Sequence, residues 1–213
     1  RLFEACSTGV RPLSQVLFHG CGGSSSVHIA MNEDPTIRLT GLSRTANSSR
    51  FFENVQSDAD LINGFPNTLD KLSEFRVVVL SNLRPGDLTD NQQQLLAKYC
   101  GQLGGGVLMI GGQQTFNASW RDSRLEELLP VHFAVVGNTD SNQSFSIEVT
   151  DRALKHPVFQ ISDDISTSEA WNNLPLFSNR AIVDDVKPGA EIWLKSQGGS
   201  GNPVLMASQR YGN

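Results

Sequence analysis

The chain has 213 residues, a formal net charge of −5, 38% hydrophobic and 18% charged residues, which excludes disordered and fibrous classes. The acidic balance, with no Lys/Arg cluster, argues against a nucleic-acid partner. Apolar runs such as Val77 to Leu80 are far shorter than the ~20 residues that cross a bilayer, so we expect a soluble segment without direct membrane insertion.

The first part of the chain alternates between strand and helix patterns. Leu13 to His19 is a short apolar run before a glycine-rich loop, which predicts a buried strand. Ser26 to Asn32 predicts a short helix, and Ile37 to Leu42 predicts a second strand. The polar stretch Ser43 to Ser57 predicts a long loop.

A third strand lies between two further helices. Leu69 to Leu72 predicts a short helix, and Phe75 to Ser81 is β-branched without polar alternation, as in a parallel strand buried on both faces. Thr89 lies three residues before Gln92, the spacing of a capping box, which predicts a helix from Asp90 to Gln102.

Glycines mark the end of this helix and of the next strand. Gly104 to Gly106 fits a left-handed helix cap and a tight turn. The strand Val107 to Ile110 then ends at Gly111 and Gly112, and Leu125 to Leu129 predicts another helix, closed by Pro130.

This alternation predicts an α/β fold, a three-layer sandwich whose mostly parallel sheet is built around Val107 to Ile110. We expect one domain over residues 1–213, with an α/β core over residues 1–130 and a mixed, β-rich extension over residues 131–213. The strands expected in that extension are Phe133 to Val136, Phe145 to Val149, Ile182 to Val186, Glu191 to Leu194 and Pro203 to Ala207.

Several stretches, in their order and spacing, resemble the class I glutamine amidotransferase-like domain of uncharacterised bacterial membrane proteins, often found beside von Willebrand type A modules and abundant in planctomycete-type bacteria. The stretches are Asn32 to Leu39, Phe75 to Gly112, Leu125 to Val131, His156 to Phe159, Ala170 to Pro175, Lys187 to Ala190 and Gln209 to Gly212.

The resemblance implies a flavodoxin-like sheet and a bacterial, membrane-anchored parent protein. It also implies that a glycine-arginine strand would follow Tyr211 and Gly212, so the chain is expected to be an excised piece that lacks this strand. The compartment of the segment itself stays open.

A working glutaminase carries a cysteine on the strand-to-helix turn where this chain has Gly111. Without a side chain there, no thiolate can attack an amide, so we expect no catalytic residue. The glycines could serve the turn alone. Alternatively, the backbone amides of Gly111 and Gly112, with Gln113, Gln114 and Thr115, could hold a carboxylate or a sugar hydroxyl.

The candidate ligand-binding residues lie where the predicted strands end, because open α/β sheets bind ligands beyond the carboxyl ends of their strands. Trp120 is included as a stacking residue at the rim. The full candidate set is Gly20, Cys21, Ser81, Asn82, Gly111, Gly112, Gln113, Gln114 and Trp120.

The cysteines and acids predict neither a metal site nor a cofactor. Cys6, Cys21 and Cys100 lack paired zinc-site spacing and fit free thiols, although a Cys6–Cys21 bridge stays open. Cys21 follows His19 by two positions, which allows a nucleophile and base, but a lone cysteine in a glycine-rich loop is usually inert. Adjacent acids such as Asp163 and Asp164 fit solvated turns.

Three hypotheses follow. The first is a non-catalytic module that binds a protein partner or a small polar ligand. The second is a carbohydrate or amide hydrolase that uses the loops after Gly20, Ser81 and Gly111. The third is a structural spacer, which predicts no cleft.

Overall fold

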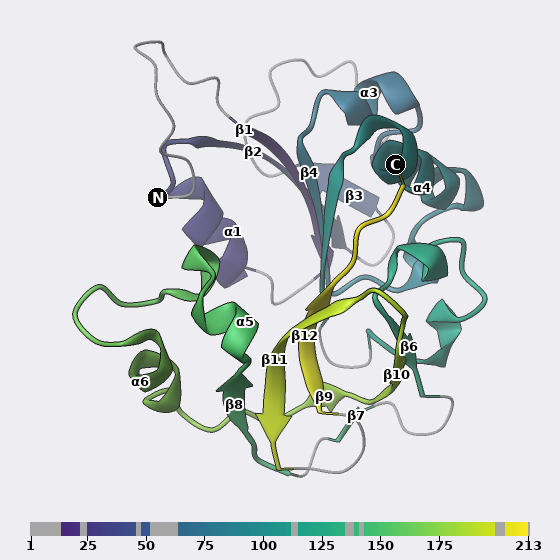
Figure 1. Ribbon diagram of the computed structural model, residues 1–213. Helices are drawn as coiled ribbons and strands as arrows, with labels where there is room; N and C mark the ends of the chain where they lie inside the picture. The colour runs from purple at the N-terminus through teal and green to yellow at the C-terminus, as the bar shows by residue number, and fades with distance from the viewer. Residues whose placement is uncertain are drawn as a thin grey trace. The chain divides into compact units, whose positions relative to one another are not determined.

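The computed structural model, drawn in Figure 1, divides into two compact units. The N-terminal unit contains the described residues up to Thr115, together with Asp122–Glu127, Tyr211 and Gly212. The C-terminal unit contains Phe116–Arg121 and the described residues of Leu128–Arg210. The structure describes residues 14–21, 25–45, 48–51, 64–111, 115–134, 139–140, 143–198 and 203–212.

The N-terminal unit is built on one five-stranded sheet of order β3-β2-β1-β4-β5. Four strands are parallel, and β3 is antiparallel to β2. The expected α/β class with a mostly parallel sheet is therefore confirmed. The strands are β1 Ser14–Cys21, β2 Ile37–Thr45, β3 Ser48–Phe51, β4 Val77–Ser81 and β5 Gly106–Ile110.

The sheet differs from the prediction at both ends. The expected loop from Ser43 to Ser57 is wrong in part, since β2 continues to Thr45 and β3 pairs with it. These residues are polar apart from Phe51, and the antiparallel ladder stabilises a strand that carries no apolar pattern. At the other end, β5 is an edge strand of the described sheet, so the sheet is not built around Val107 to Ile110. The central strand is β1, because strand order depends on the crossovers rather than on apolar content.

Helices lie on both sides of this sheet (Figure 1). Helix α1 (Ser25–Asn32) places Val27 and Met31 against a buried cluster that includes Val16, Phe18 and Leu39. On the other side lie α3 (Leu69–Ser73) and α4 (Asp90–Leu103), which contact each other.

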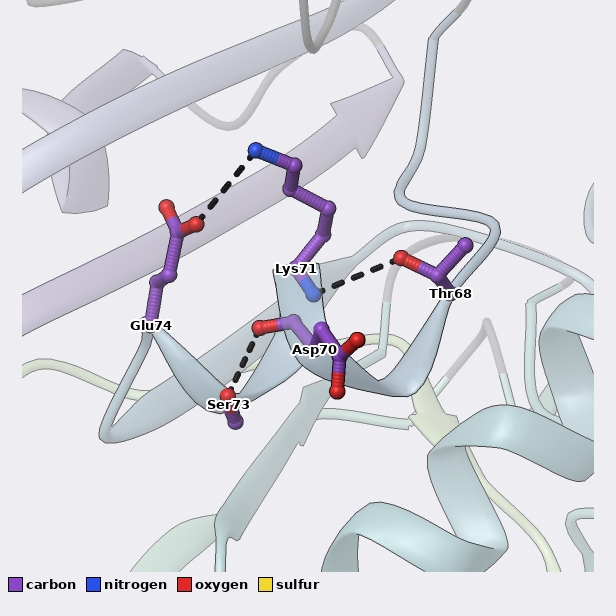
Figure 2. A network of polar contacts seen from close by, with 5 residues as sticks. All are labelled: Thr68, Asp70, Lys71, Ser73 and Glu74. Atoms are coloured by element: carbon purple, nitrogen blue, oxygen red, sulfur yellow. Dashed lines mark hydrogen bonds and ion pairs between the residues drawn. The ribbon is translucent and has the colours of Figure 1, made fainter.

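Local polar contacts stabilise the short helix α3, as Figure 2 shows. The Thr68 hydroxyl caps the first turn by accepting from the Lys71 amide. The hydroxyl of Ser73 donates to the carbonyl of Asp70 over 2.6 Å, and Lys71 Nζ lies 3.5 Å from a Glu74 carboxylate oxygen. The predicted short helix is therefore confirmed, one residue longer than expected.

The predicted start and glycine cap of α4 are confirmed, and the helix is one residue longer than expected. Thr89 and Gln92 form the capping box, since each side chain bonds to the other residue's backbone. Gly104 ends the helix in the left-handed region, with φ +67°. At Gly105 the requirement is steric instead, because an added Cβ would lie 2.0 Å from the ring of Tyr99.

The helix expected from Leu125 to Leu129 is wrong. The chain forms a single 3-10 turn, η3 (Glu126–Leu128), preceded by a turn that the Glu126 amide closes by donating to the Ser123 carbonyl. Pro130 lacks an amide proton and restricts the preceding residue, so the segment is too short for an α-helix.

The C-terminal unit is rich in strands, as expected, and each of its described strand pairs is antiparallel. Its sheets have the orders β12-β11-β8, β10-β6 and β7-β9. Its buried cluster contains Ala153, Phe159 and Leu194, with Trp171 and Trp193 packed against it. The elements are β6 Val131–Phe133, β7 Thr139–Asp140, β8 Ser146–Val149, α5 Asp151–Leu154, α6 Thr167–Asn172, β9 Arg180–Ala181, β10 Val183–Val186, β11 Glu191–Gln197 and β12 Val204–Ser208.

Candidate functional site

The candidate site lies at the carboxyl ends of three neighbouring strands in the N-terminal unit. The strand register aligns Gly20 at the end of β1 with Ser81 at the end of β4. Ser81 in turn aligns with Ile110, the last residue of β5, and the exposed Gly111 follows. This is the position at which open α/β sheets bind ligands.

Asn82 leaves β4 in an unusual backbone conformation. Its φ is +53°, in the left-handed region that few non-glycine residues adopt. The amide of Asn82 donates to the carbonyl of Ile110 over 2.9 Å, which holds the turn to the end of β5. Strained backbone of this kind is concentrated at functional sites, and asparagine accepts it at a lower cost than most residues.

The side chain of Asn82 is held by Thr115. The Thr115 hydroxyl donates to Asn82 Oδ1 over 2.6 Å, and Thr115 is 3% exposed. Because the amide oxygen accepts from Thr115, the amide nitrogen carries its two hydrogens on the other side of the group. This hydrogen bond joins Thr115 to the turn after β4, and Ser81, the last residue of β4, is 4% exposed.

His19 is a buried histidine near the end of β1, and it is 2% exposed. Its Nδ1 lies 3.2 Å from the carbonyl oxygen of Leu42. A carbonyl can only accept, so Nδ1 carries the proton and Nε2 of the neutral ring is the accepting nitrogen. The ring of Phe65 lies 5.5 Å away, centroid to centroid.

Some of the candidate residues lie within the described part of the structure and others lie outside it. Gly20 is buried in β1, and Gly111 is exposed directly after β5. Cys21 ends β1, so strand alternation places positions 19 and 21 on the same side of that strand, but its side chain lies outside the described part. Gly112, Gln113 and Gln114 lie outside the described residues.

Trp120 does not lie at an exposed rim. It is 2% exposed and belongs to the C-terminal unit, whereas the other described candidates belong to the N-terminal unit. Its ring meets the edge of Phe116, which stacks on Phe133 at 4.9 Å between centroids. This packing corrects the expected stacking role, because the ring face is covered by protein.

The described part of the site favours neutral polar chemistry. Ser81, Asn82 and Thr115 carry no charge, and the described residues contain no group of three or more His, Cys, Asp or Glu able to hold a metal ion. Cys100 lies elsewhere, in α4, where burial raises the pKa of its thiol to about 11. A thiol of that pKa is a poor nucleophile at neutral pH.

The sequence did not predict that Asn82 and Thr115 pair with each other. Both residues were noted as polar positions after predicted strands, but nothing in the sequence connects two side chains 33 positions apart. The left-handed backbone of Asn82 likewise has no glycine to mark it.

No protein-family model matches the chain, and no curated protein matches its sequence. Solved structures do share its fold. The cytoplasmic protein STM1381 from Salmonella typhimurium LT2 is 18% identical with a TM-score of 0.56, over 92% of this chain and 83% of that one. The cytoplasmic protein STM3548 from Salmonella typhimurium is 18% identical with a TM-score of 0.55, over 90% and 81%.

A third similar structure is a protein from Bacteroides uniformis ATCC 8492 described as thua-like. It is 13% identical with a TM-score of 0.57, over 98% of this chain and 82% of that one. At these identities the likeness concerns the fold alone, which is broadly α/β. Within the described ranges, no helix is both long and apolar enough to span a membrane.

Proposed function

We propose that this chain is a non-catalytic, amidotransferase-like module that binds a small, neutral polar ligand at Ser81, Asn82 and Thr115. The four parallel strands, counted in chain order, are arranged 2-1-3-4, which agrees with the start of the flavodoxin-like order. The module would serve a larger bacterial protein anchored in a membrane, as the sequence resemblance implies.

The observation that carries this proposal is the hydrogen bond between Thr115 and the left-handed Asn82. A turn needed only for the fold would favour glycine at φ +53°, because glycine adopts this conformation without strain. An asparagine fixed by a buried hydroxyl instead presents an oriented amide at the ligand-binding edge of the sheet. Such an amide can recognise hydroxyl, amide or carbonyl groups.

The glycine at position 111 supports a binding role over glutaminase chemistry. Gly111 stands directly after β5, at the turn where the amidotransferase resemblance would require a cysteine. A glycine there can offer a backbone amide but no thiolate.

Ligand binding can be tested by thermal unfolding with a panel of L-glutamine, L-asparagine, D-glucose and glycerol. Binding to the folded state raises the melting temperature increasingly as the ligand concentration exceeds Kd. We expect at least one probe to stabilise the chain, and Asn82→Ala and Thr115→Val to abolish the shift. Asn91→Ala, at an exposed position of α4, is the matched control. Shifts that persist in both site variants would contradict the proposal.

A hydrolase is the second candidate, favoured by the fixed tautomer of His19. The Leu42 carbonyl accepts from Nδ1, so Nε2 is the basic nitrogen of the neutral ring. Ammonia release from L-glutamine that is lost in His19→Gln would establish this activity and exclude the non-catalytic proposal. Release that persists in His19→Gln would assign the activity to another group or to a contaminant.

A further inference from the structure

We propose that Asn82 is the specificity-determining residue of the candidate site, and that it selects neutral ligands through a carbonyl oxygen. The proposal rests on the function proposed above and names the chemical group that the ligand presents to Ser81, Asn82 and Thr115. These three residues differ in whether a ligand can reach them and in what they offer it.

Burial leaves Asn82 as the residue of the three that a ligand can touch. Ser81 is 4% exposed and Thr115 is 3% exposed, whereas Asn82 is half-buried. Leu83, which follows in the turn, is 2% exposed and anchors the turn in the core. Direct contact with a ligand therefore falls to Asn82, and Thr115 acts through it as a positioning residue.

The Thr115 hydroxyl determines which end of the Asn82 amide is left to recognise a ligand. Oδ1 of Asn82 lies 2.6 Å from Oγ1 of Thr115, and an amide oxygen can only accept, so the hydroxyl donates. The amide nitrogen carries two hydrogens, which can only be donated. A protein group that accepts one of them leaves the other for a ligand. Asn82 therefore recognises, through its nitrogen, an atom that accepts a hydrogen bond.

This arrangement distinguishes between classes of ligand. An ammonium group can only donate, so it would meet the amide nitrogen donor to donor. A hydroxyl can donate or accept and adapts to either end of the amide. A carbonyl oxygen can only accept, so its binding depends on the nitrogen. Ser81, Asn82 and Thr115 carry no charge, which favours a neutral carbonyl over a carboxylate, because a carboxylate would lose hydration without gaining a cation.

Asn82→Asp separates the ligand contact from the fold. Aspartate keeps an oxygen for the Thr115 hydroxyl and, like asparagine, tolerates the left-handed backbone at φ +53°. It replaces the donating nitrogen by a second accepting oxygen. The melting temperature without ligand should therefore stay close to that of the unaltered chain, while recognition of a carbonyl is lost. Asn91→Asp, at an exposed position of α4, adds the same charge outside the site and is the matched control.

The probes are N,N-dimethylacetamide, whose carbonyl only accepts, and ethylammonium, whose hydrogens are only donated. Both are titrated to about 100 mM, because ligands of this size bind weakly, and Kd is measured from the backbone NMR shifts of Leu83 and Gly111. We expect N,N-dimethylacetamide to bind the unaltered chain and Asn91→Asp equally. Asn82→Asp should raise its Kd at least about tenfold, and ethylammonium should not bind the unaltered chain.

The positioning role of Thr115 gives a second measurement, which does not depend on Asn82→Asp folding. Thr115→Ser keeps the donating hydroxyl and should keep the affinity for N,N-dimethylacetamide. Thr115→Val removes the hydroxyl at nearly constant size and should raise Kd at least about tenfold. Equal affinities of the serine and valine variants would overturn the inference.

Three further results would overturn this inference and leave the proposed function standing. They are a Kd for N,N-dimethylacetamide that a folded Asn82→Asp variant leaves unchanged, a preference of the unaltered chain for ethylammonium, and binding of D-glucose or glycerol without binding of N,N-dimethylacetamide. The last would assign a hydroxyl as the recognised group. A chain that binds none of these probes, nor L-glutamine or L-asparagine, would overturn the proposed function and this inference together.

Discussion

The hydroxyl of Thr115 donates to Oδ1 of Asn82 over 2.6 Å, and this bond fixes a side chain whose own backbone is left-handed at φ +53°. Position 82 therefore combines an unfavourable backbone conformation with a hydrogen bond made by its side chain. An alanine there would keep the unfavourable φ and lose the hydrogen bond, while a glycine would lose only the hydrogen bond.

We expect Asn82→Ala to lower the free energy of unfolding by about 2 kcal/mol, of which about 1 is the lost hydrogen bond and about 1 the left-handed strain. Asn82→Gly should be less harmful by about 1 kcal/mol, because glycine adopts φ +53° freely. Urea denaturation measures both. If alanine is tolerated better than glycine, the backbone at position 82 is not left-handed in solution.

Position 105 requires a glycine because of the neighbouring Tyr99 ring, and not because of its own backbone conformation. A Cβ at position 105 would lie 2.0 Å from Tyr99 Cζ, and Tyr99 is only 1% exposed, so its ring cannot move away. Gly105→Ala should therefore cost about 3 kcal/mol of unfolding free energy. The control is Gly86→Ala, where nothing lies within 4 Å of the new Cβ and which should change stability by less than about 0.5 kcal/mol. Equal effects of the two substitutions would contradict the packing.

Tyr99 should make the chain sensitive to alkali. Burial raises the pKa of its phenol to about 12, and its hydroxyl donates to the Phe75 carbonyl over 2.9 Å. Since the folded-state pKa lies above the unfolded value of about 10, this stabilisation is complete below pH 10 and is lost as the pH rises towards 12.

The loss should be on the order of 2 kcal/mol between these pH values, measured by urea denaturation at each pH. Tyr99→Phe should reduce this pH dependence. It should not remove it, because burial also raises the pKa of Cys100, to about 11. A wild-type stability that is flat from about pH 9 to about pH 12 would contradict the burial of both groups.

Tyr211 is coupled to Glu127 within the N-terminal unit. Its hydroxyl donates to Glu127 Oε2 over 2.8 Å, and this hydrogen bond raises the pKa of Tyr211. The chain has two tyrosines, so in a Tyr99→Phe background the phenolate absorbance reports Tyr211 alone. Glu127→Gln should then shift its titration to lower pH. An unchanged titration would indicate that the bond does not persist in solution.

Much of the fold could be predicted because its signals are local. The capping box at Thr89, the glycine cap at Gly104 and the apolar run before Ser81 each depend on residues within a few positions. The edge position of β5 and the polar strand β3 could not be predicted, since both depend on which strands meet.

The sequence by itself determined the α/β class, and it predicted a ligand site at the carboxyl edge of the strands, with a glycine at position 111. Only the tertiary structure decided that Thr115 meets Asn82, that Trp120 is buried and that His19 donates through Nδ1. The physical reason is range: backbone propensity and capping act between neighbours in the chain, whereas burial and side-chain pairing depend on segments that only folding brings together.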